Sequence, residues 1–259
     1  MKIEDIIQFI EKREPGFRTK IRGCQEDMIE NLLDFLPEGR RLPRLYEAFL
    51  KALGADAGGF RLLPGGEFLA QALWFHHEEN YASYPQSRYF KFGIDAPAEG
   101  VDIVNDWFFD LERVSPSSDD AVVVRFEDEG MPEDFETEDA TDVYASFGDM
   151  LRARIFHQYV LERLPIISRL QVAAEGPMSN RENVAGEVLE LLKRFGLGEV
   201  TDSSPQLWTG ETPDNDRAAL VFIPPMSSGV SIRIAGRERK AVLMMVEPIR
   251  DQLDVVAVS

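Results

Sequence analysis

The sequence predicts an α+β fold in which helices pack on a mostly antiparallel sheet, followed by a small α+β accessory domain. Apolar residues recur at helical spacing over the first 54 positions. The period then changes to the alternation and the short β-branched runs that are typical of strands. A second helix-then-strands pattern follows near the C-terminus. We therefore expect a first domain at 1–170, a linker at 171–180 around Gly176-Pro177, and a second domain at 181–259.

Three amphipathic helices are expected at the N-terminus. Their apolar stripes occupy Ile3–Ile10, Met28–Leu36 and Leu42–Leu53. Proline and glycine follow each stripe at 15–16, 37–39 and 54, where they favour an end to the helix.

Strands are expected next, at 90–94, 107–112 and 121–126. The turn-forming residues 115–119 would join the last two as an antiparallel pair. Ser146 and Asp149 then stand at capping-box spacing before a helix that ends at Pro165.

The second domain is expected to contain one helix and four strands. Ser179 and Glu182 repeat the capping-box spacing, and Gly196 marks the end of this helix. The strand candidates are 219–223, 230–234, 241–246 and 254–258.

Negative charge is concentrated in one part of the chain. The 28 Lys and Arg against 46 Asp and Glu give a formal net charge of −18. Between Asp95 and Asp149 lie 18 acidic residues and only two basic ones, Arg113 and Arg125. Because affinity for phosphate comes from Lys and Arg, this balance argues against nucleic acid and anionic membranes as partners.

The acidic segment has two interpretations. One is a solvated loop that keeps the protein soluble, and the other is a docking surface that attracts a basic protein. For the docking surface, the candidate partner-binding residues are Asp119, Asp120, Glu127, Asp128, Glu129, Glu133, Asp134, Glu136, Glu138 and Asp139.

Aromatic residues could supply anchors beside that surface. Consecutive aromatics at 107–109 must place at least one ring on each face of a strand. If one face is open to solvent, Phe108 or Phe109 would be exposed, and Trp208 is a similar candidate in the second domain. The alternative is that both faces are covered.

The sequence gives little indication of a catalytic or metal-binding site. The only histidine cluster is at 76–79, so His76, His77 and Glu79 are the candidate metal ligands, but they lack the His-Glu-x-x-His spacing that places two ligands on one helical face. The single Cys24 excludes an intrachain disulfide and a cysteine-based zinc cluster. We expect no cofactor.

The N-terminal segment and the hydropathy predict a cytoplasmic protein. Glu4, Asp5 and Glu11 interrupt any apolar signal-peptide core, and no apolar run reaches the roughly 18 residues of a membrane span.

Several motifs resemble the SUKH superfamily over about Glu26 to Leu164. The stretch Leu42–Leu50 with Gly58-Gly59 is similar to the family's leucine-proline, aromatic and double-glycine signature. Trp107–Leu111 resembles its central strand, and Ala145–Leu151 the start of its last helix. The chain departs from the pattern at 55–57, which carries no asparagine before the double glycine.

The resemblance implies a non-enzymatic protein, since many members are bacterial immunity proteins that neutralise a cognate toxin, often a nuclease. A nuclease binds phosphates in a basic site, so an acidic surface could occupy that site. The alternatives are an adaptor or regulatory protein that recruits another basic partner and, third, a metal-dependent hydrolase built from carboxylates and His76 or His77.

Overall fold

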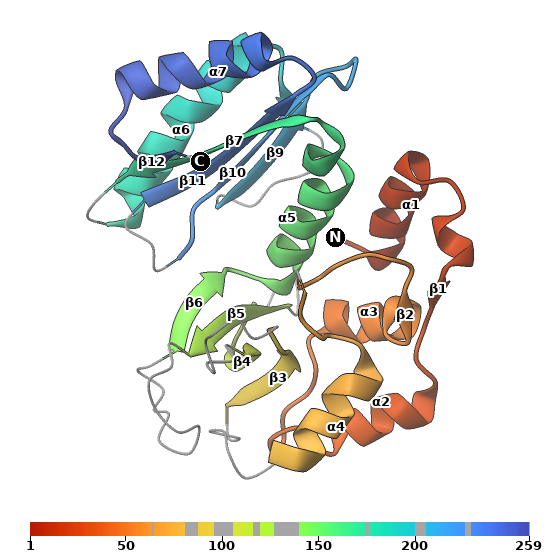
Figure 1. Ribbon diagram of the computed structural model, residues 1–259. Helices are drawn as coiled ribbons and strands as arrows, with labels where there is room; N and C mark the ends of the chain where they lie inside the picture. The colour runs from red at the N-terminus through yellow and green to blue at the C-terminus, as the bar shows by residue number, and fades with distance from the viewer. Residues whose placement is uncertain are drawn as a thin grey trace. The chain divides into compact units, whose positions relative to one another are not determined.

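Helices and antiparallel strands make up the computed structural model, which confirms the α+β class (Figure 1). The structure describes residues 1–63, 65–80, 88–95, 106–115, 120–126, 140–174, 177–199, 206–225 and 229–258. The chain divides into unit 1, Met1–Leu151, and unit 2, Arg152–Ser259.

Unit 1 begins with helices and continues with a sheet. Its elements are α1 (Ile3–Arg13), the 3-10 turn η1 (Phe17–Thr19), β1 (Ile21–Arg22), α2 (Glu26–Leu33), α3 (Arg44–Leu53), β2 (Asp56–Ala57), α4 (Ala70–Asn80), β3 (Tyr89–Gly93), β4 (Trp107–Ser115), β5 (Asp120–Phe126), β6 (Ala140–Tyr144) and the start of α5 (Phe147–Tyr159). The three expected N-terminal helices are present as α1, α2 and α3. Most of the predicted stripe residues are buried, for example Ile6, Ile7 and Ile10 in α1. In the second stripe only Ile29 and Leu32 are buried, Leu33 is 41% exposed, and α2 ends there rather than at Leu36.

The sheet of unit 1 has the order β3-β4-β5-β6, with every neighbouring pair antiparallel. Its inner face is aromatic. Phe92 stacks on Phe109 with ring centroids 4.0 Å apart, and Tyr46 of α3 meets the Phe109 ring edge-on at 4.9 Å. Phe147, the first residue of α5, lies edge-on to Phe109 at 5.3 Å. Such edge-to-face contacts add to the apolar area that the rings bury.

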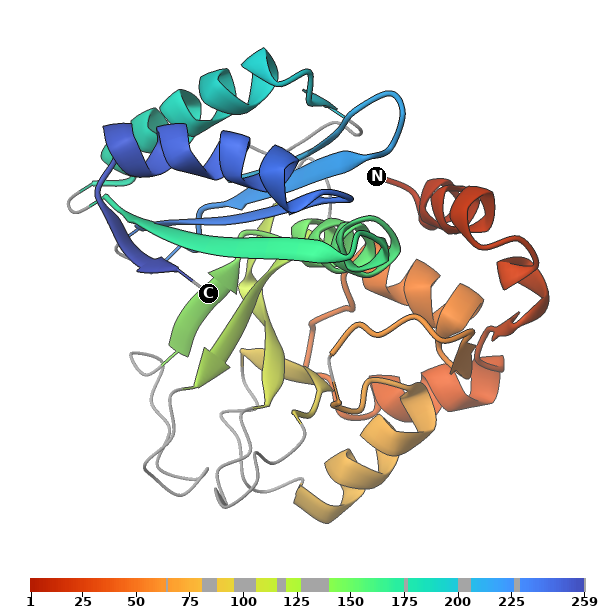
Figure 2. The same ribbon diagram turned by 45° about the horizontal axis from the view of Figure 1, so that its top comes forward.

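Unit 2 is a larger antiparallel sheet with two helices. It contains the end of α5, the 3-10 turn η4 (Leu161–Arg163), β7 (Ile166–Ala173), α6 (Met178–Arg194), β8 (Gly198–Glu199), β9 (Leu207–Glu211), β10 (Arg217–Phe222), β11 (Gly229–Gly236), α7 (Arg239–Gln252) and β12 (Val255–Val258). The strand order is β12-β7-β11-β10-β9-β8, so the first of these strands in the chain lies inside the sheet. Figure 2 shows α6 and α7 on one face of it.

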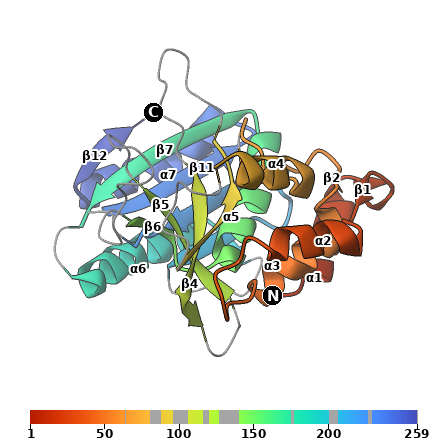
Figure 3. The same ribbon diagram turned by 90° about the horizontal axis from the view of Figure 1, so that it is seen from below.

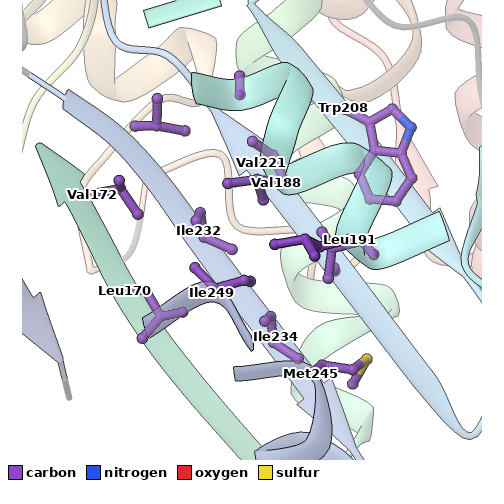
Figure 4. Close-up of a cluster of buried hydrophobic side chains, with 14 of the residues drawn as sticks. Leu170, Val172, Val188, Leu191, Trp208, Val221, Ile232, Ile234, Met245 and Ile249 are labelled. Carbon is purple, nitrogen blue, oxygen red and sulfur yellow. The ribbon is translucent and has the colours of Figure 1, made fainter. Parts of the chain in front are cut away.

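The core of unit 2 is mainly aliphatic. Ile232 and Ile234 of β11 and Leu170 of β7 point toward the helices, where they meet Met245 and Ile249 of α7 (Figure 4). Because side chains alternate along a strand, the residues between them face the other side of the sheet.

The predicted linker at 171–180 is wrong. Residues 171–173 belong to β7, and α6 begins at Met178 after Pro177. The backbone of β7 is paired on both sides, with β11 and with β12, so this segment is an inner strand. The unit boundary accordingly follows Leu151, within α5, rather than residue 170.

The predicted strand at 241–246 is also wrong, because these residues lie in α7. A short continuous apolar run fits either a strand or a helix. The buried residues Val242, Met245, Val246 and Ile249 have helical spacing, whereas Leu243 and Met244 are exposed. The expected strands near 219–223, 230–234 and 254–258 are confirmed as β10, β11 and β12. Helix α4 and strands β6, β7 and β9 were not anticipated.

Candidate functional site

Most of the predicted acidic surface lies outside the described residues, namely Asp119 and all eight candidates between Glu127 and Asp139. Asp120 is described, and its assignment to a partner-binding surface is wrong. It is 6% exposed, and its carboxylate accepts hydrogen bonds from the backbone N–H groups of Ala121 (3.0 Å) and Gly148 (2.9 Å). Burial raises the pKa of Asp120, and the backbone donors oppose that shift. Its role is to hold the start of α5.

The three proposed aromatic anchors are buried, so that prediction is wrong. Phe109 is in the inner core, while Phe108 is on the opposite face of β4 with Tyr89, Val124 and Phe126. The alternation of side chains along β4 therefore holds, but both faces are covered.

Trp208 is 6% exposed and lies in the core of unit 2 (Figure 4). A Cβ atom at Gly210, two residues along β9, would come within 2.2 Å of the Trp208 ring. Glycine at this position leaves room for the indole.

An exposed aromatic occurs instead on α4, where Phe75 is 51% exposed. It lines an open groove of about 640 Å³ in unit 1, together with Cys24, Met28, Glu67, Leu69 and His76. Helix α4 runs beside α2 (Figures 1 and 3). Residues from both helices line the groove. The sequence did contain a sign that one of these side chains is exposed, since Leu73, Trp74 and Phe75 are adjacent and apolar. Successive residues of a helix point in different directions and cannot all face one core.

The wall of the groove is mixed in chemistry. Nε2 of His76 lies 3.4 Å from Oε2 of Glu67, and Asp27 adds a second carboxylate. The Cys24 thiol is half-buried, and burial raises its pKa to about 11, so it is no activated nucleophile at neutral pH. The arrangement suits an apolar group flanked by positive charge better than covalent chemistry.

The candidate metal ligands do not converge. His77 points away from His76, and its Nε2–H donates to the carbonyl oxygen of Lys91 at 2.9 Å. Its ring stacks on Phe35 with centroids 4.8 Å apart, and burial lowers its pKa to about 4. Glu79 is exposed. Across the described ranges, no three His, Cys, Asp or Glu side chains gather as a metal site would require.

Both arginines of the acidic segment are engaged with carboxylates of that same segment. Arg113 makes a two-pronged ion pair with Asp142, at 2.6 and 2.5 Å, and a further bond to Asp110 at 2.5 Å. Arg125 binds Asp95 at 2.6 Å. The run from Glu127 to Asp139 itself contains no Lys or Arg.

Asp110 is the centre of this network. It is fully buried and also receives Nε and Nη2 of Arg88, at 2.8 and 2.7 Å. Burial alone would raise its pKa, but the hydrogen bonds from Arg88 and Arg113 outweigh burial and lower it. Lys91 and Asp106 form a second buried pair, 3.2 Å apart.

The two units differ sharply in charge. Unit 1 contains 15 Lys and Arg against 32 Asp and Glu, a net −17, whereas unit 2 contains 13 against 14 and is nearly neutral. The electrostatic attraction for a positive partner therefore belongs to unit 1.

Comparison with known proteins identifies no family. No family model matches the chain, and neither a curated protein nor a solved structure matches it. Among the helices of the described residues, none has the length and apolar character needed to cross a bilayer.

Proposed function

We propose that this protein is a non-enzymatic binding protein whose unit 1 captures a basic protein partner. The observation that carries the proposal is the net charge of −17 on unit 1, with both arginines of residues 95–149 engaged by neighbouring carboxylates. A field of that sign speeds encounter with a positive protein and opposes anionic ones.

The groove beside α4 offers such a partner an apolar anchor point. Phe75 is an exposed ring, and Met28 and Leu69 line the groove with it. Affinity in protein interfaces concentrates in a few desolvated aromatic contacts, while surrounding charges steer and orient the partner. We propose that an apolar side chain of the basic partner packs against Phe75, with its cationic neighbours facing Asp27 and Glu67.

The resemblance to SUKH immunity proteins favours a toxin as that partner, with the acidic run from Glu127 to Asp139 placed where phosphates would bind. An adaptor that recruits another basic protein would use the same physical mechanism. The metal-dependent hydrolase has weaker support, since His76 and His77 diverge.

The test of charge first identifies a basic partner by co-expressing this chain with the products of neighbouring genes, and then measures binding by titration calorimetry at several salt concentrations. Replacing Glu133, Asp134 and Glu136 by their amides should weaken binding about tenfold at low salt and reduce the salt dependence. The matched control replaces the exposed Glu182, Glu187 and Glu190 of α6 by Gln and should change the affinity less than twofold. Binding that is tight but insensitive to salt would refute the electrostatic mechanism.

The test of the groove compares two equally exposed side chains. Phe75→Ala should weaken toxin binding tenfold or more, whereas Met244→Ala, also 51% exposed but in unit 2, should leave it unchanged. Survival of cells that express the toxin together with each variant separates immunity from an adaptor role. If the variants bind equally well, the groove is not the anchor point.

A further inference from the structure

The groove in unit 1 is bordered by two helical segments whose formal charges are all negative. Residues 23–39, which include α2, contain five Asp or Glu and no Lys or Arg, and residues 67–80, which include α4, contain three and none. Asp27, Glu30 and Glu79 are exposed. Of the described residues that line the groove, Arg22 alone is a Lys or Arg, and it belongs to β1. A segment that fills the groove therefore meets carboxylates on both helices.

The sides of α4 and α2 that border the groove combine apolar and acidic residues at helical spacing. Ala72, Phe75 and Glu79 are three and four residues apart, so they share one side of α4. Ala72 and Phe75 line the groove. On α2, Asp27 lines the groove, and Glu30 is three residues further along the helix. The exposed Phe75 ring is thus an apolar contact point among carboxylates of both helices.

The dimensions of the groove fit a short helix. Helix α2 has 8 residues and α4 has 11, which correspond to roughly 12 and 16 Å of helix. The two helices lie beside each other (Figure 3), and the side-chain ridge of a third helix can pack into the space between two neighbours. The lining includes the small residues Gly23, Gly54 and Ala55, which leave room for a side chain to enter. An extended segment would instead need an open strand edge for its backbone hydrogen bonds.

We propose that this groove binds a basic amphipathic helix of the partner, about two to three turns long. The apolar stripe of that helix, with residues at i, i+3 or i+4 and i+7, covers Phe75 and Met28, and its flanking Lys and Arg side chains face Asp27, Glu30 and Glu79. The inference rests on the proposed function, because it specifies which segment of the basic partner unit 1 binds. Such a helix buries the exposed ring and neutralises the carboxylates beside it in one contact.

The binding test uses the full chain and three fluorescein-labelled peptides of about 15 residues, the length at which an alanine-rich helix begins to be stable in water. The first peptide places Leu on one side of the helix and Lys on both flanks of that stripe. The second contains the same residues in an order that breaks the stripe, and the third is the first with Pro at its centre. Fluorescence anisotropy should show saturable binding of the first peptide. The second should bind at least tenfold more weakly despite its equal charge, and so should the third, because proline breaks a helix.

Variants of the chain show where the first peptide binds. Phe75→Ala should weaken its binding at least tenfold, whereas Met244→Ala, equally exposed but in unit 2, should bind it as the wild type does. Glu79→Gln should weaken binding about threefold at low salt, the effect of one exposed charge pair, and the control Glu187→Gln on α6 should not. A circular dichroism spectrum like that of the wild type shows that each variant is folded.

The outcomes separate this inference from the proposed function. Equal binding of the first and second peptides, or of the first and third, would overturn the helix in the groove. The same holds for undiminished binding of the first peptide by a folded Phe75→Ala protein, and for no saturable binding of that peptide by the wild type. Capture of a basic partner by the charge of unit 1 survives each of these results if binding of the partner depends on salt, and it fails if that salt dependence is absent.

Discussion

The two units reach a buried core in different ways. Unit 1 relies on a few large rings, with Phe92, Phe109 and Phe147 in mutual contact at 4.0 to 5.7 Å and Tyr46 against them. Unit 2 relies on many aliphatic side chains from four strands and two helices. Removing a large ring from unit 1 leaves a larger cavity than removing an aliphatic side chain from unit 2. Damage to single residues should be more costly in unit 1.

The units also differ in the partners of their buried charged side chains. Unit 1 buries the carboxylate of Asp110 and pairs it with two arginines, and it buries Lys91 against Asp106. Unit 2 buries Arg181, which donates to the carbonyl oxygens of Pro224 and Pro225 at 3.1 and 2.9 Å. Stability of unit 1 thus depends more on intact ion pairs.

The largest expected effect comes from Phe109→Ala. Removing a fully buried ring that contacts Tyr46, Phe92 and Phe147 should lower the free energy of unfolding of unit 1 by about 4 kcal/mol. The counterpart in unit 2, Ile232→Val, should cost about 1 kcal/mol. Amide hydrogen exchange in β4 and β10 reports the units separately. Equal loss of protection in both strands after Phe109→Ala would show that the units unfold together. It would contradict the conclusion that the two cores are stabilised separately.

Breaking the ion-pair network should come next. Asp110→Asn leaves Arg88 and Arg113 without their buried counter-charge, at a cost of about 3 kcal/mol, the lower end for buried pairs because both arginines are partly exposed. Urea unfolding followed by tryptophan fluorescence measures this change. As a control, Glu47→Gln removes only the exposed ion pair with Lys51 in α3. It should leave the midpoint of urea unfolding unchanged. A similar midpoint for both variants would mean that the network contributes little.

The acid sensitivity of unit 1 is an effect that is absent at neutral pH and develops only as the pH falls. His77 has a folded pKa of about 4 against an unfolded value near 6.5, so the unfolded chain takes up the proton first. The contribution of His77 to the free energy of unfolding is complete above pH 6.5 and is lost as the pH falls from there through about 4. The total loss is at most about 3 kcal/mol. His77→Gln should remove this loss from unit 1, as measured by hydrogen exchange in β3 at pH 4.5 and 7.

Unit 2 provides the internal control for that measurement. His157 also has a pKa of about 4, so exchange in β11 should keep its pH dependence in the His77→Gln protein. If hydrogen exchange in β3 of the His77→Gln protein remains as sensitive to acid as in the wild type, the burial of His77 is not the cause of the acid sensitivity of unit 1.

Part of this architecture was predictable because its signals are local. The stripe of Ile6, Ile7 and Ile10 and the alternation of Phe90 and Phe92 follow from the repeats of a helix and a strand, which the order of residues contains. The apolar run at 241–246 in α7 was ambiguous, since a run of only six residues fits both the helical and the strand repeat. Helix α4 carries apolar residues on several sides and so lacked a clear stripe.

The sequence by itself determined the α+β class, the buried sides of the N-terminal helices and the excess of negative charge on the first half of the chain. Only the tertiary structure decided that Asp120 holds α5, that Phe108 and Trp208 are covered while Phe75 is exposed, and that α4 lies beside α2. Periodicity and charge depend on near neighbours in the chain. Burial and pairing depend on which distant strand or helix arrives on the other side, and that choice belongs to the whole fold.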